Sequence, residues 1–180
     1  MRRLTTILVL ALGLLLLTAQ ASLAAAPHFK KGGEPVCTVS GSAASKSTTC
    51  SASLAGLGQQ TLNINVTASG SAVYQCSNNG GNTAPGQNRV LVGPVTAPTT
   101  IPADQIKNGN VSFTTNPAVL TAPDTVTGAQ AGCPNPNWTG VNPVLTVTDI
   151  SMTIAQGGAT LFTCTASNPN GLSGTVPLSC

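Results

Sequence analysis

Charged residues, aromatic side chains and histidine are all scarce in this chain of 180 residues. Charged residues make up only 6% of it, against roughly 25% in an ordinary globular domain. The surface must therefore be covered by Thr, Ser, Asn, Gln and Gly, which suits an extracellular β-protein. Aromatic residues make up only 3%, so the core must be built from Val, Leu, Ile and Ala and has less apolar area per side chain. Covalent cross-links are correspondingly more valuable to its stability.

Histidine occurs once, at His28, and this scarcity removes the imidazole base from most hydrolytic sites. The nearest acid is Glu34, and Phe-Lys-Lys-Gly-Gly lies between the two. We expect His28 to be a solvated residue with no catalytic or metal-binding role. A calcium site needs several oxygen ligands, usually from clustered acids, and the sequence has no such cluster. We therefore expect no metal and no cofactor.

The chain begins MRRLTTILVLALGLLLLTAQASLAAA, with two arginines, an apolar run and then small residues. This order predicts a secretory signal peptide over residues 1–24, cleaved after Ala24, with cleavage after Ala26 as the alternative. The apolar run from Ile7 to Leu17 is shorter than the roughly 20 residues that a membrane span needs. We therefore expect a secreted, extracellular protein that is not embedded in a membrane.

Removal of residues 1–24 leaves five basic and four acidic residues, a net charge of +1. Nucleic-acid binding depends on clustered cations that neutralise phosphates. We therefore expect no nucleic-acid partner.

After residues 25–35, which we predict to be a flexible lead-in, short strand patterns recur with turns between them. In TLNINV, residues 61–66, apolar and polar side chains alternate as in a half-buried strand. Turns are expected at residues 55–58, 68–70 and 155–158, the first and last of them within hairpins, and IPADQIKNG could hold one helical turn. Further strands are expected in STTCSASL, SAVYQC, RVLVG, NVSFTT, VLTVTDISMTI and ATLFTCTA.

This succession of strands predicts an all-β fold, an immunoglobulin-like antiparallel β-sandwich of about eight strands. Residues 36–180 are long enough for a single domain. The likeness is one of architecture, because Trp138 sits in a loop rich in Pro and Asn and not inside a strand.

Cys76 opens the stretch CSNNGGNTAPGQN, which has no charge, no aromatic side chain and almost no aliphatic bulk. This stretch, together with IPADQIKNGNVSF, GCPNPNWTG and the strand run containing Asp149, resembles a group of small secreted bacterial proteins of unassigned function. The similarity runs from about residue 47 to residue 164. It implies an exported β-sandwich in which Cys76 and Cys133 are paired, and it implies no activity for any residue.

The chain has six cysteines: Cys37, Cys50, Cys76, Cys133, Cys164 and Cys180. An even number in an exported chain argues for three disulfide bonds, whose pairing sequence alone does not determine. A bond between Cys76 and Cys133 would hold two polar loops at one end of the sandwich. With it we favour Cys37–Cys50 across a hairpin and Cys164–Cys180 tying down the C-terminal tail. The competing scheme joins Cys50 with Cys164 and Cys37 with Cys180.

The polar loops supply the candidate binding residues, which are Asn79, Asn82, Gln87 and Trp138. Trp138 could be an exposed plate for a sugar ring, or equally a loop anchor folded over the end of the sandwich. The partner is unknown and could be a surface protein or a glycan.

Three functions follow in descending order. The first is a secreted, non-catalytic domain with a binding or structural role at or outside the cell surface. The second is a carrier of a small apolar ligand, which requires a cleft lined by aliphatic side chains. The third is a hydrolase acting through Asp149 and a second acid, whereas the simpler interpretation makes Asp149 an outward strand residue or part of a bulge.

Overall fold

A computed structural model describes residues 26–180, so the predicted signal peptide lies outside the described residues. The described part contains twelve strands and two very short helices. The strands are β1 His28–Phe29, β2 Val36–Gly41, β3 Ser45–Ala55, β4 Leu62–Ser77, β5 Thr83–Pro85, β6 Val90–Ile101, β7 Val111–Thr114, β8 Ala118–Thr121, β9 Val126–Thr127, β10 Thr139–Gln156, β11 Ala159–Leu172 and β12 Gly174–Pro177. The helices are η2 Ala103–Gln105 and α2 Gly128–Ala131. Within residues 26–180, neither helix has the length or apolar character to cross a membrane.

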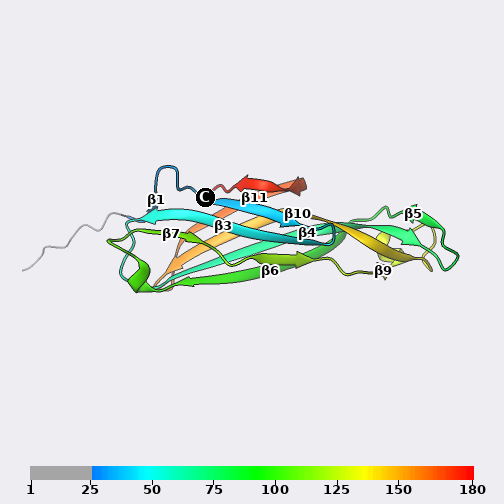
Figure 1. Cartoon of the computed structure of the whole chain (residues 1–180), viewed down its shortest axis with the longest axis horizontal. Helices are drawn as coiled ribbons and strands as arrows, with labels where there is room; N and C mark the ends of the chain where they lie inside the picture. The colour runs from blue at the N-terminus through cyan, green and yellow to red at the C-terminus, as the bar shows by residue number, and fades with distance from the viewer. Residues whose placement is uncertain (1–25) are drawn as a thin grey trace, which may run out of the picture.

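The strands form two antiparallel sheets (Figure 1). In the first sheet, β3 is central and pairs with β1, β2, β7 and β8, while β12 pairs with β2. In the second sheet, β4 and β10 pair with each other; β4 also pairs with β5 and β6, and β10 with β9 and β11. The predicted all-β antiparallel sandwich is confirmed. The strand count exceeds eight in part because β1, β5 and β9, of two or three residues each, are too short to show an alternating pattern. The strands β2, β8 and β12 were also not predicted.

The core lies between the sheets and is mainly aliphatic. Along β4, Leu62, Ile64 and Val66 are fully buried while Asn63 and Asn65 are exposed, as the alternation in TLNINV predicts. Each such side chain contributes about 1.5–3 kcal/mol by its burial. The same alternation places mainly hydroxyl and amide groups on the outer faces of the sheets, which explains how a chain with few charges keeps a largely polar surface.

The predicted hairpin at residues 47–66 is wrong, because β3 and β4 belong to different sheets and do not pair. Residues 56–61 cross from one sheet to the other. Gln156 holds this crossing: its Oε1 accepts a hydrogen bond from the Gly58 N–H, and its Nε2 donates to the carbonyls of Gly58 and Gln60. A Gly-rich turn signal marks a chain reversal but does not distinguish a hairpin from a connection between sheets.

The predicted turn at residues 68–70 is also wrong, because β4 continues through it as a strand of 16 residues. The irregularities lie in the neighbouring strands, where the registers of β6 and β10 shift opposite Ser69. Gly70 is required here because a Cβ atom on it would collide with the backbone carbonyl of Thr146. The small residues Ala68, Ser69 and Gly70 therefore lie where the backbones of β4 and β10 approach closely.

We expect Gly70→Ala to lower the free energy of unfolding by about 1–3 kcal/mol, because the backbones of β4 and β10 must separate to admit the methyl group. Gly58→Ala is the matched control, since its Cβ would lie 3.5 Å from Gln156 Oε1, an ordinary van der Waals contact. Urea denaturation of both variants measures the difference. Equal stability of the two variants would contradict this account of Gly70.

The structure differs from the sequence prediction at residues 25–35. His28–Phe29 pairs with Leu54 and Ala55 of β3, and the Lys30 N–H donates to the Ser53 carbonyl at 2.9 Å. The ring of Phe29 lies 4.5 Å from that of Phe162, measured between centroids. The described part of this segment is therefore an edge of the first sheet, because one apolar ring and a few backbone hydrogen bonds suffice to hold it there.

Two local predictions are confirmed and one helix was missed. The turn between β10 and β11 uses Gly157 and Gly158, whose φ angles of 58° and 85° suit a tight hairpin. The single helical turn expected in IPADQIKNG is η2. The missed helix α2 begins with a capping box, in which Thr127 accepts from the Gln130 N–H and the Gln130 side chain accepts from the Thr127 N–H. The spacing T-x-x-Q was the available signal.

Candidate binding surfaces

Three disulfide bonds join the described cysteines in the pairs favoured from the sequence. Cys37 and Cys50 lie directly opposite each other on β2 and β3. Cys164 of β11 is bonded to Cys180. The third bond, Cys76–Cys133, joins the end of β4 to the residues after α2. Three disulfide bonds indicate an oxidising environment.

The Cys76–Cys133 bond lies at the end of the molecule that carries β5 and β9, opposite the end with β1 (Figure 1). We call the part formed by β5, β9, α2 and their loops the disulfide end. Hydrogen bonds fix its loop from residue 78 to residue 88. Asn78 Oδ1 accepts from the backbone of Gly80 and Asn82, and the Asn88 N–H donates to the Ala131 carbonyl at 3.1 Å. The loop that follows Cys76 is thus held mainly by backbone and amide hydrogen bonds, with Ala84 packed against the core.

The sequence-predicted binding residues all lie at the disulfide end, but they differ in exposure. Asn79, Asn82 and Gln87 are exposed. Trp138 is partly buried and packs against the core, and its backbone N–H donates to the Asn135 carbonyl at 3.1 Å. Three amides are therefore presented to solvent, while the position of Trp138 matches the loop-anchor alternative.

A largely apolar depression also lies near the disulfide end. It has a volume of about 390 Å³, and its apolar lining comes from Val73, Tyr74, Ala84, Pro85 and Val144. Val73 and Val144 are paired across β4 and β10 and are 39% and 52% exposed. This depression is where the apolar-carrier hypothesis places a ligand.

Asp149 lies exposed on the outer face of the second sheet, next to a register shift in β10. Its carboxylate accepts hydrogen bonds from Ser167 Oγ at 2.6 Å and Thr148 Oγ1 at 2.7 Å. These bonds, the Ser167 bond first, lower the pKa of Asp149. The hollow beside it is otherwise lined by hydroxyl groups and aliphatic atoms, with no second acid among its lining residues. The expected strand or bulge position is therefore found, and the carboxylate pair that a hydrolase needs is not assembled here.

We expect the Asp149 carboxyl to titrate below its ordinary range and Ser167→Ala to raise its pKa, because a hydroxyl donor stabilises the ionised form. Carbon-detected NMR measures the titration, and Thr163→Ala on the same strand is the control. The resulting stabilisation is present above the unfolded-state pKa of about 3.9 and is lost as the pH falls through the lower folded pKa. A pKa raised above the ordinary range would instead support a general acid.

The two sheets leave two seams along their edges, and the C-terminal segment closes one of them. In the first sheet, β12 of this segment pairs with β2. In the second, the N–H of Thr165 in β11 donates to the Ser179 carbonyl at 2.8 Å and the Ser179 N–H donates back at 2.9 Å. One extended segment therefore joins an edge of each sheet.

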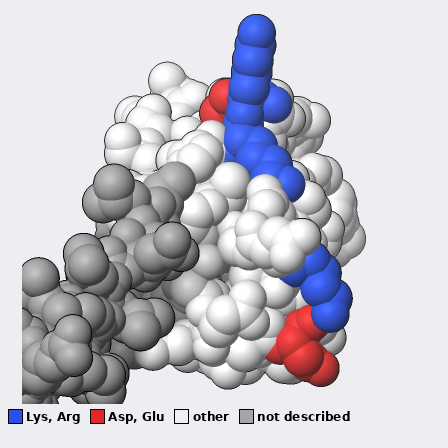
Figure 2. Space-filling view, turned by 90° about the vertical axis from the view of Figure 1, so that its left-hand side faces the viewer, with Lys and Arg blue, Asp and Glu red and all other residues white. Residues whose placement is uncertain are grey.

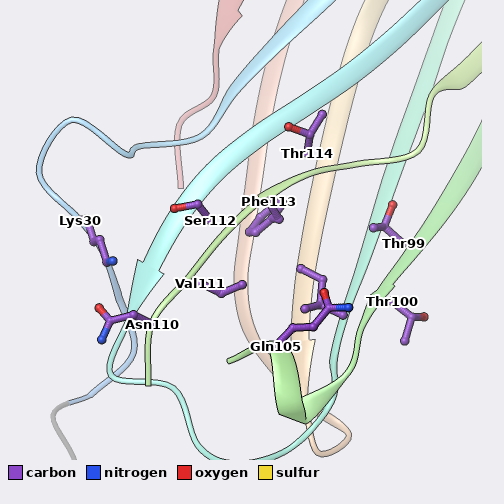
Figure 3. Close-up of a pocket in the computed structure, with 10 residues that line it drawn as sticks. Lys30, Thr99, Thr100, Gln105, Asn110, Val111, Ser112, Phe113 and Thr114 are labelled. Atoms are coloured by element: carbon purple, nitrogen blue, oxygen red, sulfur yellow. The ribbon is translucent and has the colours of Figure 1, made fainter. Parts of the chain in front are cut away.

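The other seam lies between β6 and β7 and is open over part of its length (Figure 3). The groove there has a volume of about 530 Å³. Its floor is apolar and buried, formed by Ile101, Val111 and Phe113. One end is closed by Asn116, whose side chain donates to the Pro98 carbonyl at 2.7 Å and whose N–H donates to Thr99 Oγ1 at 2.8 Å. The other end is marked by Gln105 of η2.

Main-chain groups of β7 face this groove. The backbone N–H and C=O of Ser53 are hydrogen-bonded on the β1 side of β3, to Gly33 and Lys30. Ser53 and its neighbour Ser112 in β7 therefore form a non-hydrogen-bonded pair. Since backbone direction alternates along a strand, Ser112 and Thr114 direct their N–H and C=O groups away from β3. Among the described residues, neither has a backbone hydrogen-bond partner.

The facing edge of β6 is arranged in the same way. The Pro98 carbonyl points toward Asn116 and away from β4. By the same alternation, Thr100 directs its backbone groups into the seam. Sequence reasoning missed this groove because it arises where two separate sheets meet, although Pro94 and Pro98 in β6 are typical of an edge strand.

Basic side chains lie at the same end of the molecule as the groove. Lys30 lines the groove beside Asn110 (Figure 3), and Lys107 is bonded through its backbone to Asn110 at 3.0 Å. Figure 2, which views this end, shows basic side chains down one side with acidic ones beside them. The acids nearest in sequence are Glu34 and Asp104. The mouth of the groove therefore carries positive charge at Lys30.

Comparison with known proteins adds no further assignment. No protein-family model matches the chain, and no curated protein is significantly similar to it. The resemblance to small secreted bacterial proteins stays a prediction.

Proposed function

We propose that the protein is a secreted, non-catalytic domain that binds a partner at or outside the cell surface. The observation that carries this proposal is the groove between β6 and β7, where a buried apolar floor lies between two strand edges with free main-chain groups. Such an edge is a ready template for pairing with another chain. In a binding role, the partner would pair with these free main-chain groups and cover the apolar floor.

The compartment is supported by three independent features. The six cysteines are all paired. The sequence predicts a signal peptide over residues 1–24, and mainly hydroxyl and amide groups lie on the outer faces of both sheets. The proposal also includes the immunoglobulin-like kind of sandwich and the likeness to small secreted bacterial proteins, which rest on the two antiparallel sheets and on the motifs around Cys76 and Cys133.

The experiment is a saturation-binding measurement on the source organism. Purified, fluorescently labelled protein is added to intact cells and, separately, to proteins recovered from the culture medium. We expect saturable binding that unlabelled protein displaces, and the same binding by Asp149→Asn, because no step of recognition uses this carboxylate as a catalyst. Protein that has been reduced and alkylated is the control for non-specific adsorption.

Two results would overturn the proposal. One is binding that does not saturate or that the reduced protein reproduces. The other is turnover of a cell-surface polymer that Asp149→Asn abolishes with the fold intact, which would favour the hydrolase. Peptide mapping of protein recovered from the medium reads the mature N-terminus in the same preparation, and its absence from the medium and cell surface would remove the secreted part of the proposal.

A further inference from the structure

We propose that the groove between β6 and β7 receives an extended segment of a partner protein, which adds as a strand between these two edges. The inference rests on the proposed binding function and names the site and the class of partner. Recognition of this kind uses main-chain hydrogen bonds for affinity and side-chain pockets for selectivity.

The opposite seam of the same molecule shows how one extended segment satisfies two sheet edges. There the segment containing β12 and Ser179 pairs with β2 and with Thr165 of β11. Between β6 and β7, no described segment takes this position. The groove is thus the counterpart of a seam that the chain fills with its own strand.

The two edges are not in direct contact, as insertion of a strand between them requires. Most Cα atoms of β6 lie more than 8 Å from those of β7. A strand lies about 4.8 Å from its neighbour, so an inserted strand with two neighbours needs a gap of about 9.6 Å. The open edge of β7 covers the four residues of Val111–Thr114, a length of about 13 Å at about 3.3 Å per residue.

The groove chemistry favours a polypeptide over a glycan. The backbone groups of Thr100, Ser112 and Thr114 present donors and acceptors at the period of a strand. The aromatic ring in the groove belongs to Phe113, which is 8% exposed and lies in the floor, so it offers no open plate for stacking a sugar. A peptide that places small apolar side chains toward this floor and an acidic residue near Lys30 matches both the floor and the charge.

The test begins with a displayed library of random linear eight-residue peptides selected on the purified protein. We expect enriched peptides to alternate apolar and polar residues and to carry an acid toward one end. Amide NMR shifts on adding a synthetic enriched peptide should centre on Thr100, Ser112 and Thr114. Shifts centred on the disulfide end, or a selection that enriches no binding peptide, would overturn the inference.

Main-chain recognition is tested by removing single donors. N-methylation of an alternate amide in the enriched peptide should weaken binding about tenfold, the effect of losing one hydrogen bond of about 1.4 kcal/mol. Thr114→Pro should do the same, since it removes an N–H that faces the groove and not the β3 ladder. Thr114→Val, which keeps the N–H, is the matched control and should bind as the wild type does. If the N-methylated peptide binds as tightly as the unmodified one, and Thr114→Pro binds as tightly as Thr114→Val and the wild type, strand addition is overturned.

The charge at the groove mouth is tested with a pair of lysines. Lys30→Ala should weaken binding of an acidic peptide several-fold and reduce its dependence on salt. Lys46→Ala, on β3 where it pairs with Gly41 and Leu120, should leave both unchanged. The same loss in both variants would contradict a local role for Lys30.

The outcomes separate this inference from the proposed function. If Thr114→Pro binds cells as the wild type does while the selected peptides fail to reach the groove, the groove inference falls and the binding function stands. If the wild-type protein binds no cell-surface or secreted component, the function falls as well. Concentration-dependent self-association that shifts the same amides and that Thr114→Pro abolishes would identify a second copy of this chain as occupant and overturn the choice of partner.

Discussion

Replacing both Cys76 and Cys133 by alanine is expected to lower the free energy of unfolding by about 4 kcal/mol, the largest effect that we predict for any single cross-link. The two residues are 57 apart in sequence, and closing a loop of that length restricts the unfolded chain by about 4 kcal/mol on the chain-entropy model. Alanine is used because Cys76 is fully buried and a serine would bury a new hydroxyl group. Urea denaturation followed by circular dichroism measures the loss.

The matched control removes the Cys164–Cys180 bond, whose residues are 16 apart. The same model predicts a smaller loss of about 3 kcal/mol for this shorter loop. We also expect the Cys76 and Cys133 double variant to loosen the disulfide end selectively, so that Asn79 and Asn82 become mobile while the sandwich amides keep their NMR shifts. A variant as stable as the wild type would show that the bond adds nothing to a loop already held by Asn78 and Asn88.

The second large effect concerns the core of β4. Ile64→Ala is expected to cost about 2–5 kcal/mol, because the side chain is fully buried between the sheets and its removal leaves a cavity. Asn65→Ala is the control, since Asn65 is exposed on the other face of the same strand and its loss should stay within about 0.5 kcal/mol. Chemical denaturation of both variants compares the two faces.

Similar losses from both variants would contradict the assignment of inner and outer faces. A one-residue slip of β4 would move its whole apolar set to the outside, so this pair of variants tests the register as well as the burial.

Local features of the fold were predictable because they depend on neighbouring residues. The alternation in TLNINV correctly gives the inner face of β4, and Gly157 and Gly158 correctly mark a tight hairpin. The arrangement of strands in space was less accessible. The AGLG sequence at residues 55–58 signals a reversal, but only the tertiary packing, with Gln156 holding the crossing, decides that β3 and β4 enter different sheets.

The candidate binding surfaces also separate features that neighbouring residues determine from features that depend on the tertiary arrangement. Asn79, Asn82 and Gln87 were found because polar loops without apolar anchors stand out in a sequence, and the structure exposes all three. The groove has no such signal, since it depends on main-chain groups of Ser112 and Thr114 that any residue would provide. Its existence follows from which edges the chain leaves unpaired, and this is a property of topology.

The central claim is that the seam between β6 and β7 is open and ready to accept a strand, and amide hydrogen exchange tests it most directly. In the isolated protein, the amides of Val111 and Phe113 should be protected because they bond to β3, while those of Ser112, Thr114 and Thr100 should exchange rapidly. Adding an enriched peptide should protect these three amides. Slow exchange at Ser112 and Thr114 in the isolated protein would show that the edge is already paired and would contradict the account.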